Sequence, residues 1–208
     1  MAEKSTSSLH DLVLSLAEPL VSALGLVIWG IEITHANHSL VRIFIDGNDP
    51  LPSDKTANEL HQPSIDQCER ISRDLGLALD VEDCFPEAWT LEVSTPGLDR
   101  TFFSLSQMQA YVGDVVCARM LAPYPSGQGG RKTWRGLLQD VSDDAFTIQP
   151  VQITNDDYIE ELAMEPVTLP WSALRRVNRV ALFPKPEKPG KASSRKKRRN
   201  TGKTPENN

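Results

Sequence analysis

The glycine-rich stretch from Gly127 to Lys132 combines residue types that can bind phosphate groups. A nucleotide-binding P-loop requires glycine directly before the lysine, a strand before the motif and a helix after it. Here Arg131 stands between Gly130 and Lys132, and residues typical of β-strands follow. The stretch therefore predicts the tip of a basic β-hairpin rather than a nucleotide site.

Two other groups contain residue types that could bind a metal ion. His35 and His38 are close in sequence but lie in a predicted turn without a nearby cysteine, and two histidines do not complete the four-ligand shell of zinc. Asp80, Glu82 and Asp83 could bind magnesium through their carboxylates, but they follow a predicted helix as an ordinary acidic connection. No Gly-x-Ser-x-Gly elbow offers a nucleophile. We predict no metal, no cofactor and no catalytic activity.

Basic residues alternate with an aromatic residue just after the glycines. Arg131, Lys132 and Arg135 could contact phosphates, and Trp134 between them could stack on an exposed base or peptide. The alternatives are a solvated basic hairpin and a core position for Trp134. The sequence alone leaves both alternatives open.

The most distinctive stretch of the chain runs from Leu91 to Arg100. A β-type run leads directly into a Pro-Gly pair, which imposes a turn of defined type. The residues of this turn are Ser94, Pro96, Gly97, Leu98 and Asp99. We expect Leu98 to fold back onto the core, and Asp99 and Arg100 to fix the exit of a domain. Arg100 could pair locally, or it could also contact a binding partner, and it is a candidate for both roles.

Charge is segregated along the 208 residues. The chain has 22 basic and 28 acidic residues, but residues 184–208 hold nine basic and two acidic residues, a net charge of +7. Residues 1–183 therefore carry a net charge of −13. The basic run consists of Arg195, Lys196, Lys197, Arg198 and Arg199. An acidic body with a basic tail predicts a polyanionic partner for the tail. The alternative is a solubilising tail lying against the acidic residues 155–165.

Hydropathy and cysteine usage exclude several classes of protein. The uncharged stretch Pro19–Ile31 is far shorter than the roughly 20 residues that cross a bilayer. Glu18 precedes it, where a signal peptide would carry positive charge. The cysteines are odd in number and widely spaced: Cys68, Cys84 and Cys117. We therefore expect free thiols, a cytoplasmic location and no contact with membranes.

The first half of the chain alternates helical and β-type periodicity. Apolar residues recur every three or four positions from Leu9 to Leu24, which predicts a helix. Val27–Ile33 and Leu40–Asp46 are β-type runs that could form a hairpin. A capping box opens a second helix from Ser64 to Leu79, and Trp89–Ser94 forms a third strand. This order predicts one small sheet covered by two helices, an α+β arrangement.

The second half of the chain is rich in short β-type runs. Ser104 can cap a short helix. Five runs follow it: Asp114–Met120, Thr133–Asp140, Ala145–Gln149, Val167–Leu169 and Val177–Leu182. Five short strands over about 70 residues predict a small closed barrel. Residues 123–130 and 155–165 are expected to be loops between these strands.

Three parts of the chain follow from these patterns. Residues 1–103 form an N-terminal α+β domain, and residues 104–183 form a C-terminal β-barrel domain. Residues 184–208 contain four prolines and no large apolar residue. Such a segment cannot bury a core, so we expect a disordered basic tail.

The stretch Leu91–Arg100 resembles the signature of the RimP family of bacterial ribosome maturation factors. Upstream, Ile31-Glu32 and Arg42–Asp46 are similar to the first two strands of that family. Ser64–Ser72 is similar to its second helix, and Leu79–Asp83 to the segment after that helix.

The resemblance, which covers roughly residues 9–183, implies both fold and function. It implies an N-terminal three-stranded sheet with two helices, followed by an Sm-like (SH3-type) small β-barrel. It also implies a non-enzymatic factor that binds the free 30S ribosomal subunit and assists its maturation. In that family the partners are a small-subunit ribosomal protein and rRNA.

An Sm-like barrel also allows another interpretation, an RNA-binding regulator unrelated to ribosome assembly. Such regulators often act as rings built through free edge strands. A fused N-terminal domain would hinder ring formation sterically, so we expect a monomer.

Overall fold

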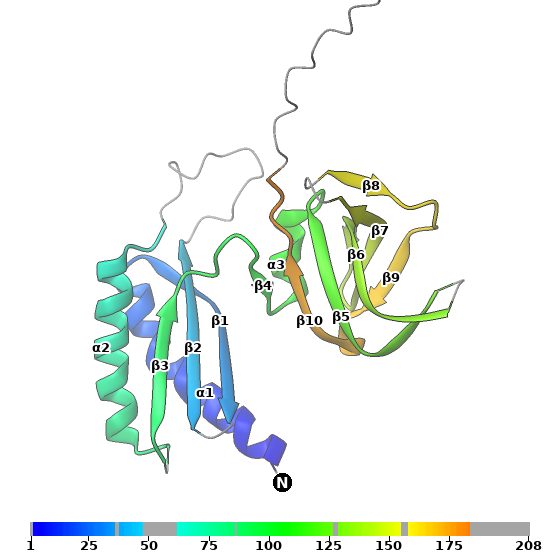
Figure 1. Ribbon diagram of the computed structural model, residues 1–208. Helices are drawn as coiled ribbons and strands as arrows, with labels where there is room; N and C mark the ends of the chain where they lie inside the picture. Colours follow the sequence, from blue (N-terminus) through cyan, green and yellow to red (C-terminus); the bar gives the residue numbers. More distant parts are fainter. Residues whose placement is uncertain are drawn as a thin grey trace, which may run out of the picture.

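The computed structural model describes residues 2–35, 38–47, 62–85, 87–126, 129–154 and 158–183. Two β-sheets form, one from three strands between residues 26 and 94 and one from seven strands between residues 101 and 179. Figure 1 shows the two sheets side by side, the smaller one with both long helices against one of its faces. The α+β class expected from the sequence is confirmed.

The N-terminal sheet follows the chain in order. Helix α1 (Ala2–Ser22) leads into strands β1 (Leu26–His35) and β2 (Ser39–Gly47), which pair antiparallel. Helix α2 (Ile65–Glu82) then crosses over to β3 (Trp89–Ser94), which pairs parallel to β2. The sheet order is therefore β1-β2-β3, with β1 and β3 at the edges.

Local sequence signals set the limits of the long helices. The Ser64 hydroxyl accepts a hydrogen bond from the Gln67 amide at 3.2 Å, and the Gln67 side chain accepts one from the Ser64 amide at 2.9 Å. This reciprocal pair is the predicted capping box, and it is confirmed. Helix α2 ends only at Glu82, three residues later than expected. Helix α1 begins at Ala2, because no glycine or proline interrupts the residues before Ser8.

One apolar core lies between the N-terminal sheet and its two helices. Its fully buried members come from α1, α2 and β2: Val13, Ala17, Val21, Ile71, Leu75, Leu79, Val41, Ile43 and Ile45. The helical residues recur at three- and four-residue spacing and the strand residues at every second position, so each element turns one face inward. Burial of apolar surface at about 25 cal/mol per Å² drives this packing.

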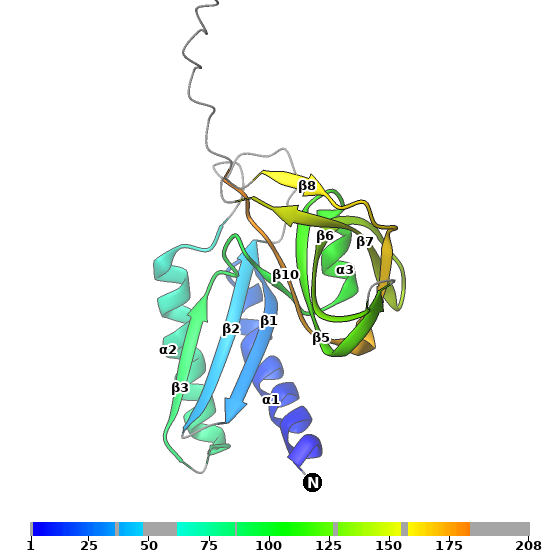
Figure 2. The same cartoon turned by 45° about the vertical axis from the view of Figure 1, so that its right-hand side comes forward.

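The C-terminal sheet contains more strands than the sequence predicted. They are β4 (Thr101–Phe102), β5 (Val115–Ser126), β6 (Gly129–Val141), β7 (Ala145–Ile153), β8 (Ile159–Glu161), β9 (Val167–Pro170) and β10 (Leu174–Arg179). The strand order is β4-β10-β5-β6-β7-β8, with β9 also paired to β7. Figure 2 shows this sheet curling round on itself. Helix α3 (Leu105–Met108), which Ser104 caps as expected, packs Met108 into the core of this sheet.

Two expectations for this sheet were wrong in detail. Residues 123–130 were expected to be a loop, but β5 continues to Ser126 and β6 begins at Gly129. An irregularity in the pairing between Arg119 and Tyr124 accommodates Pro123, which cannot donate to a regular ladder. The acidic segment 155–165 contains β8, which the sequence did not predict. A strand of three residues is too short to show periodicity.

A second apolar core fills the curled sheet. Its largest fully buried side chains come from β6, β7, β9 and α3: Trp134, Leu138, Phe146, Ile148, Leu169 and Met108. Trp29 of β1 also packs against this core, although it belongs to the N-terminal sheet. The two sheets are therefore joined by shared apolar packing as well as by the chain.

No helix in the described ranges is both long enough and apolar enough to cross a bilayer. The three cysteines are free; Cys117 is buried, and Cys68 and Cys84 are half-buried.

Candidate functional site

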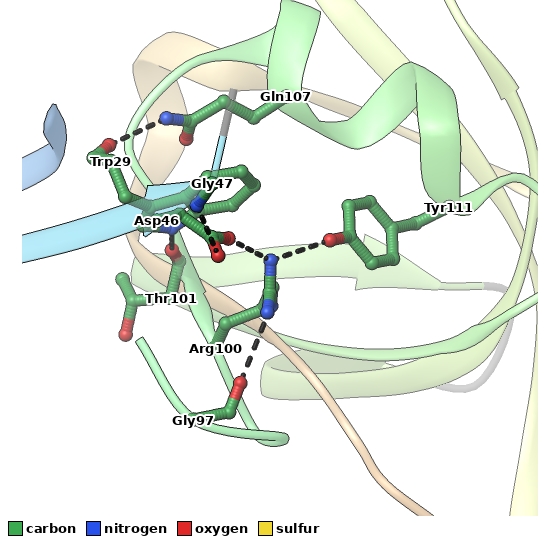
Figure 3. Close-up of polar contacts among 8 residues, drawn as sticks. All are labelled: Trp29, Asp46, Gly47, Gly97, Arg100, Thr101, Gln107 and Tyr111. Atoms are coloured by element: carbon green, nitrogen blue, oxygen red, sulfur yellow. Dashed lines mark hydrogen bonds and ion pairs between the residues drawn. The ribbon is translucent and has the colours of Figure 1, made fainter. Parts of the chain in front are cut away.

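Arg100 lies between the two sheets with only 6% of its surface exposed. Its guanidinium Nη1 donates to Asp46 Oδ2 at the end of β2 and to the phenolic oxygen of Tyr111, both at 2.7 Å. Its Nε donates to the carbonyl of Gly97 at 3.3 Å. Figure 3 shows these three partners converging on one guanidinium. The side chain thus connects the N-terminal sheet, the turn after β3 and the helical segment before β5.

Aromatic rings surround the same guanidinium. The Arg100 guanidinium carbon lies 4.9 Å from the Trp29 ring centroid and 5.6 Å from that of Tyr111. Tyr111 also packs edge-on against Phe102, with centroids 5.1 Å apart. A cation over an aromatic face is attracted by the ring quadrupole, by about 2 kcal/mol when desolvated. A buried charge needs such compensation, because its desolvation costs several kcal/mol.

A second set of contacts holds the two sheets together beside Arg100. The indole Nε1 of Trp29 donates to the carbonyl of Thr101 at 2.7 Å, and the Gln107 side chain donates to the carbonyl of Trp29 at 2.6 Å. Phe103 lies directly on Gly30, where a Cβ would stand 2.1 Å from the ring. Only glycine leaves room for this approach, so β1 carries glycine at the point of closest contact.

The predicted turn after β3 positions both Arg100 and the segment that directly follows β10. Gly97 adopts φ +71°, a left-handed conformation that favours glycine. Asp99 accepts a hydrogen bond from the Ala181 amide at 2.7 Å, so it holds the segment that follows β10. Ser94 ends β3, and Pro96 is half-buried. The expectation that Leu98 folds onto the core was wrong, because this side chain is 58% exposed.

Arg100 and Asp99 therefore lie at the junction, but Arg100 is not available as a contact residue. Its guanidinium is buried, and its Nη1 and Nε atoms donate to Asp46, Tyr111 and Gly97. A phosphate could reach it only if these bonds broke. The surface role considered for Arg100 is corrected to a positioning role.

Tyr111 has an environment that disfavours its ionised form. Burial raises the pKa of the Tyr111 phenol, and the Asp46 carboxylate raises it further, while Arg100 and Arg179 act in the opposite direction. The phenol therefore stays protonated and can accept from Arg100 at neutral pH.

The basic hairpin residues divide between surface and core. Arg131, Lys132 and Arg135 are exposed. Trp134 is only 1% exposed and belongs to the second apolar core, so the core alternative holds for this residue. Its ring cannot stack on an external base, although the Arg131 guanidinium carbon lies 5.7 Å from its centroid.

The basic run from Arg195 to Arg199 lies outside the described residues. So do Gln128 and Gly127 at the hairpin tip, and most of the segment 47–63. Within the described ranges, no group of three or more histidine, cysteine, aspartate or glutamate side chains could hold a metal ion.

The structure adds basic residues that sequence patterns did not single out. Strands β5, β6 and β10 together carry seven basic residues and one acidic residue. Four of them were missed: Arg119, Arg175, Arg176 and Arg179. They come from segments more than 50 residues apart, and only the pairing of β5 with β10 brings them together. A count of charge per predicted strand is the only signal in the sequence that could have indicated them.

A cleft of about 380 Å³ opens at the β10 edge of these strands. Its lining includes Thr101, Phe103, Trp171, Arg175 and Arg176, with Glu32 on the side of the N-terminal sheet. The lining of the cleft thus combines two arginines, three aromatic rings (those of Phe102, Phe103 and Trp171) and one carboxylate. Such a set suits an anionic ligand with a planar group better than it suits catalysis.

Comparison with known proteins identifies the family. Residues 16–99 match the sequence profile of the RimP N-terminal domain. A relative from Desulfovibrio desulfuricans, named ribosome maturation factor RimP, is 42% identical, over 89% of this chain and 84% of its own length. Proteins of the same name from Nitratidesulfovibrio vulgaris (strain Miyazaki F) and Lawsonia intracellularis are 37% and 32% identical, over 93% and 88% of this chain and 92% and 93% of their own lengths. This level of identity over nearly the whole chain shows that the protein belongs to the RimP family.

Proposed function

We propose that this protein is a ribosome maturation factor that binds the free 30S subunit and assists its maturation without catalysing a reaction. The observation that carries the proposal is the similarity to proteins of that name over 84–93% of their own lengths. Its immediate partners would be rRNA and a small-subunit ribosomal protein. We expect it to act in the cytoplasm as a monomer.

The proposed architecture has three parts with separate tasks. Residues 1–103 would form one domain and residues 104–183 an Sm-like barrel of the SH3 type. Support for the barrel comes from the curled order β4-β10-β5-β6-β7 and from the 3₁₀ turn Trp171–Ala173 before the last strand. The Arg100 contacts would hold the two domains in one orientation. A fixed orientation would suit a factor that recognises the shape of the 30S subunit.

Co-sedimentation tests this function. The full chain is mixed with free small subunits, with complete ribosomes and with naked rRNA, and each mixture is separated on a sucrose gradient. We expect recovery with free small subunits rather than with translating ribosomes. Equal or greater recovery in the polysome fraction would contradict the proposal. A sizing column separates the monomer expected here from the ring expected of an Sm-like regulator.

The basic tail has a distinct expected role as an electrostatic arm. Residues 184–208 carry a net charge of +7 next to a body of −13. If about four basic residues engage RNA at once, truncation after Phe183 should lower the log–log salt slope of binding by about 3, since each contact contributes ~0.7–0.9. An unchanged affinity and salt slope for free 30S subunits would leave the tail with a solubilising role only.

A further inference from the structure

The register of the C-terminal sheet places arginines from three neighbouring strands on one face. Arg176 of β10 pairs with Arg119 of β5, which in turn pairs with Thr133 of β6. Arg135, two residues after Thr133, pairs with Cys117, two residues before Arg119. Paired residues and residues two apart point to the same side of a sheet. Arg119, Arg135 and Arg176 therefore share one face, which we call the arginine face.

The arginine face is the outer side of the sheet. The alternate row, Val177, Ala118 and Trp134, is buried in the second core. The side chains of Arg119 and Arg135 are exposed and form no ion pair or side-chain hydrogen bond with any residue that the structure describes. Two of the three guanidinium groups thus have no internal partner.

Arg176 is held in place without being neutralised. Its Nε donates to the Thr101 hydroxyl at 3.0 Å, and its nearest carboxylate is that of Glu32 at 3.9 Å. Both side chains of this ion pair are partly exposed, and such a pair screens the charge only weakly. The hydrogen bond to a neutral hydroxyl orients the guanidinium and leaves its charge available.

This concentration of charge is unusual for the chain. Strands β5, β6 and β10 have a net charge of +6, whereas residues 1–183 as a whole have −13. Directly opposite residues on paired strands lie about 5 Å apart and diagonal ones about 7–8 Å, and like charges at these distances destabilise the sheet. Sheet formation therefore brings together charges that a bound polyanion would neutralise.

The cleft of about 380 Å³ adjoins the arginine face at its β10 edge, because Arg176 of that face also lines the cleft. Phe103 and Trp171 contribute half-buried aromatic rings, and Arg175 contributes an exposed guanidinium. Aromatic rings and guanidinium planes are the groups on which proteins stack unpaired RNA bases. The cleft could accept one base only if that base were not already stacked in a duplex.

We propose that the arginine face and the adjoining cleft bind single-stranded RNA, with phosphates on Arg119, Arg135 and Arg176 and one unstacked base in the cleft. The inference rests on the proposed function in one respect, namely that this RNA is an unpaired segment of rRNA in the immature 30S subunit. Figure 2 shows β10, β5 and β6 as neighbouring strands of the curled sheet.

The test compares two double variants of the full chain that change net charge equally. Arg119→Gln with Arg135→Gln removes two charges from the arginine face. Arg70→Gln with Arg73→Gln removes two charges from α2, where both arginines are exposed and pair with neighbouring carboxylates on the same helix. Binding is measured against a single-stranded RNA of mixed sequence, the same sequence as a duplex, and free 30S subunits, between 50 and 200 mM salt. The tail is present in every variant, so its contribution cancels.

We expect the arginine-face variant to bind the single strand about 25-fold more weakly at 0.1 M salt and to show a salt slope lower by about 1.4, since each phosphate contact contributes ~0.7. The affinity of the α2 variant for the single strand should differ from that of the unmodified chain by less than about threefold, because its two lost charges lie far from the arginine face and act there only through a screened electrostatic field. Thermal unfolding should be the same for both variants.

Other outcomes would overturn the inference. Equal losses of RNA affinity in the two variants would show that the effect comes from net charge and not from the arginine face. Weaker binding to 30S subunits with unchanged binding to RNA would assign the face to a protein partner. Tight RNA binding through the arginine face with no binding to 30S subunits would instead contradict the proposed function and leave the RNA site standing.

The cleft has its own variants. Arg175→Gln changes an exposed side chain, and Trp171→Leu removes an aromatic ring from the lining. Both should weaken binding to the single strand, about fivefold or more for the tryptophan, and should leave the duplex unaffected, because stacking on one base is worth ~1–3 kcal/mol. If Trp171→Leu unfolds the sheet, Arg175→Gln alone decides. Equal losses of affinity for the single strand and the duplex would show that the cleft does not bind an unstacked base.

Discussion

Arginine side chains occur both at the junction between the two sheets and on the arginine face, but in opposite environments. Arg100 is 6% exposed and donates to Asp46, Tyr111 and Gly97 within the chain. The Arg119 side chain is exposed and forms no hydrogen bond or ion pair within the described ranges. A guanidinium that is desolvated must be paired, whereas one in water can remain free for a ligand. The comparison separates arginines that hold the fold from arginines that can bind.

The largest expected effect comes from breaking the junction. Arg100→Ala leaves the Asp46 carboxylate without its cation and the Tyr111 phenol without its donor, so we expect a loss of about 3–5 kcal/mol in the free energy of unfolding. Urea denaturation followed by circular dichroism measures this loss. Arg70→Ala, on the exposed surface of α2, is the matched control and should change stability by less than about 0.5 kcal/mol. A similar small effect for Arg100→Ala would refute the structural role.

The next effect concerns the close approach of the two sheets. A Cβ at position 30 would lie 2.1 Å from the Phe103 ring, so Gly30→Ala must displace that ring. We expect a destabilisation of about 1–3 kcal/mol, as for other overpacked sites. The double variant Gly30→Ala with Phe103→Leu should recover part of this loss in thermal unfolding, and no recovery would show that the strain lies elsewhere.

A pH effect should distinguish the junction from the surface. Burial raises the pKa of Tyr111 in the folded state, so ionisation of this phenol is less favourable in the folded than in the unfolded chain. The corresponding stability is present below the unfolded pKa of about 10 and is lost as the pH rises through the folded pKa. Thermal melts from pH 8 to 11 should therefore fall more steeply for the unmodified chain than for Tyr111→Phe. Parallel curves would contradict this assignment.

The smallest expected effect is on the stability of the arginine-face variant. Arg119→Gln with Arg135→Gln breaks no internal bond, so its free energy of unfolding should stay within about 0.5 kcal/mol of the original value. Lysine substitutions sharpen the contrast. Arg119→Lys with Arg135→Lys should keep most RNA affinity, because a phosphate accepts any nearby cation, whereas Arg100→Lys cannot reproduce the forked donation at the junction.

The sequence predicted features that depend on neighbouring residues. The capping box at Ser64 and the short helix after Ser104 follow from contacts within four residues. The alternation of Thr133, Trp134 and Arg135 already allowed a buried tryptophan between two exposed side chains. Such signals are local, so they can be recognised without knowledge of the fold.

The features that matter most for function depend on distant residues. Asp46 lies 54 positions from Arg100, and the residues paired with Arg119 in the sheet come from β10 and β6, the strands on either side of β5. Strand order and register, rather than any motif, decide that Arg176 and Arg135 share a face. The two-residue strand β4 likewise forms only when it pairs with β10, and the cleft beside it only when Glu32 of the N-terminal sheet lies opposite.

Ultraviolet cross-linking of the full chain to free 30S subunits can show directly whether RNA lies on the arginine face, because it requires no substitution. Nucleotide-bearing peptides are then identified by mass spectrometry. We expect cross-links in β5, β6 and β10 and around the cleft beside Trp171, with none in α2 or β3. Cross-links confined to the N-terminal sheet, or to the segment after Phe183, would contradict the assignment of the arginine face as the RNA-binding surface.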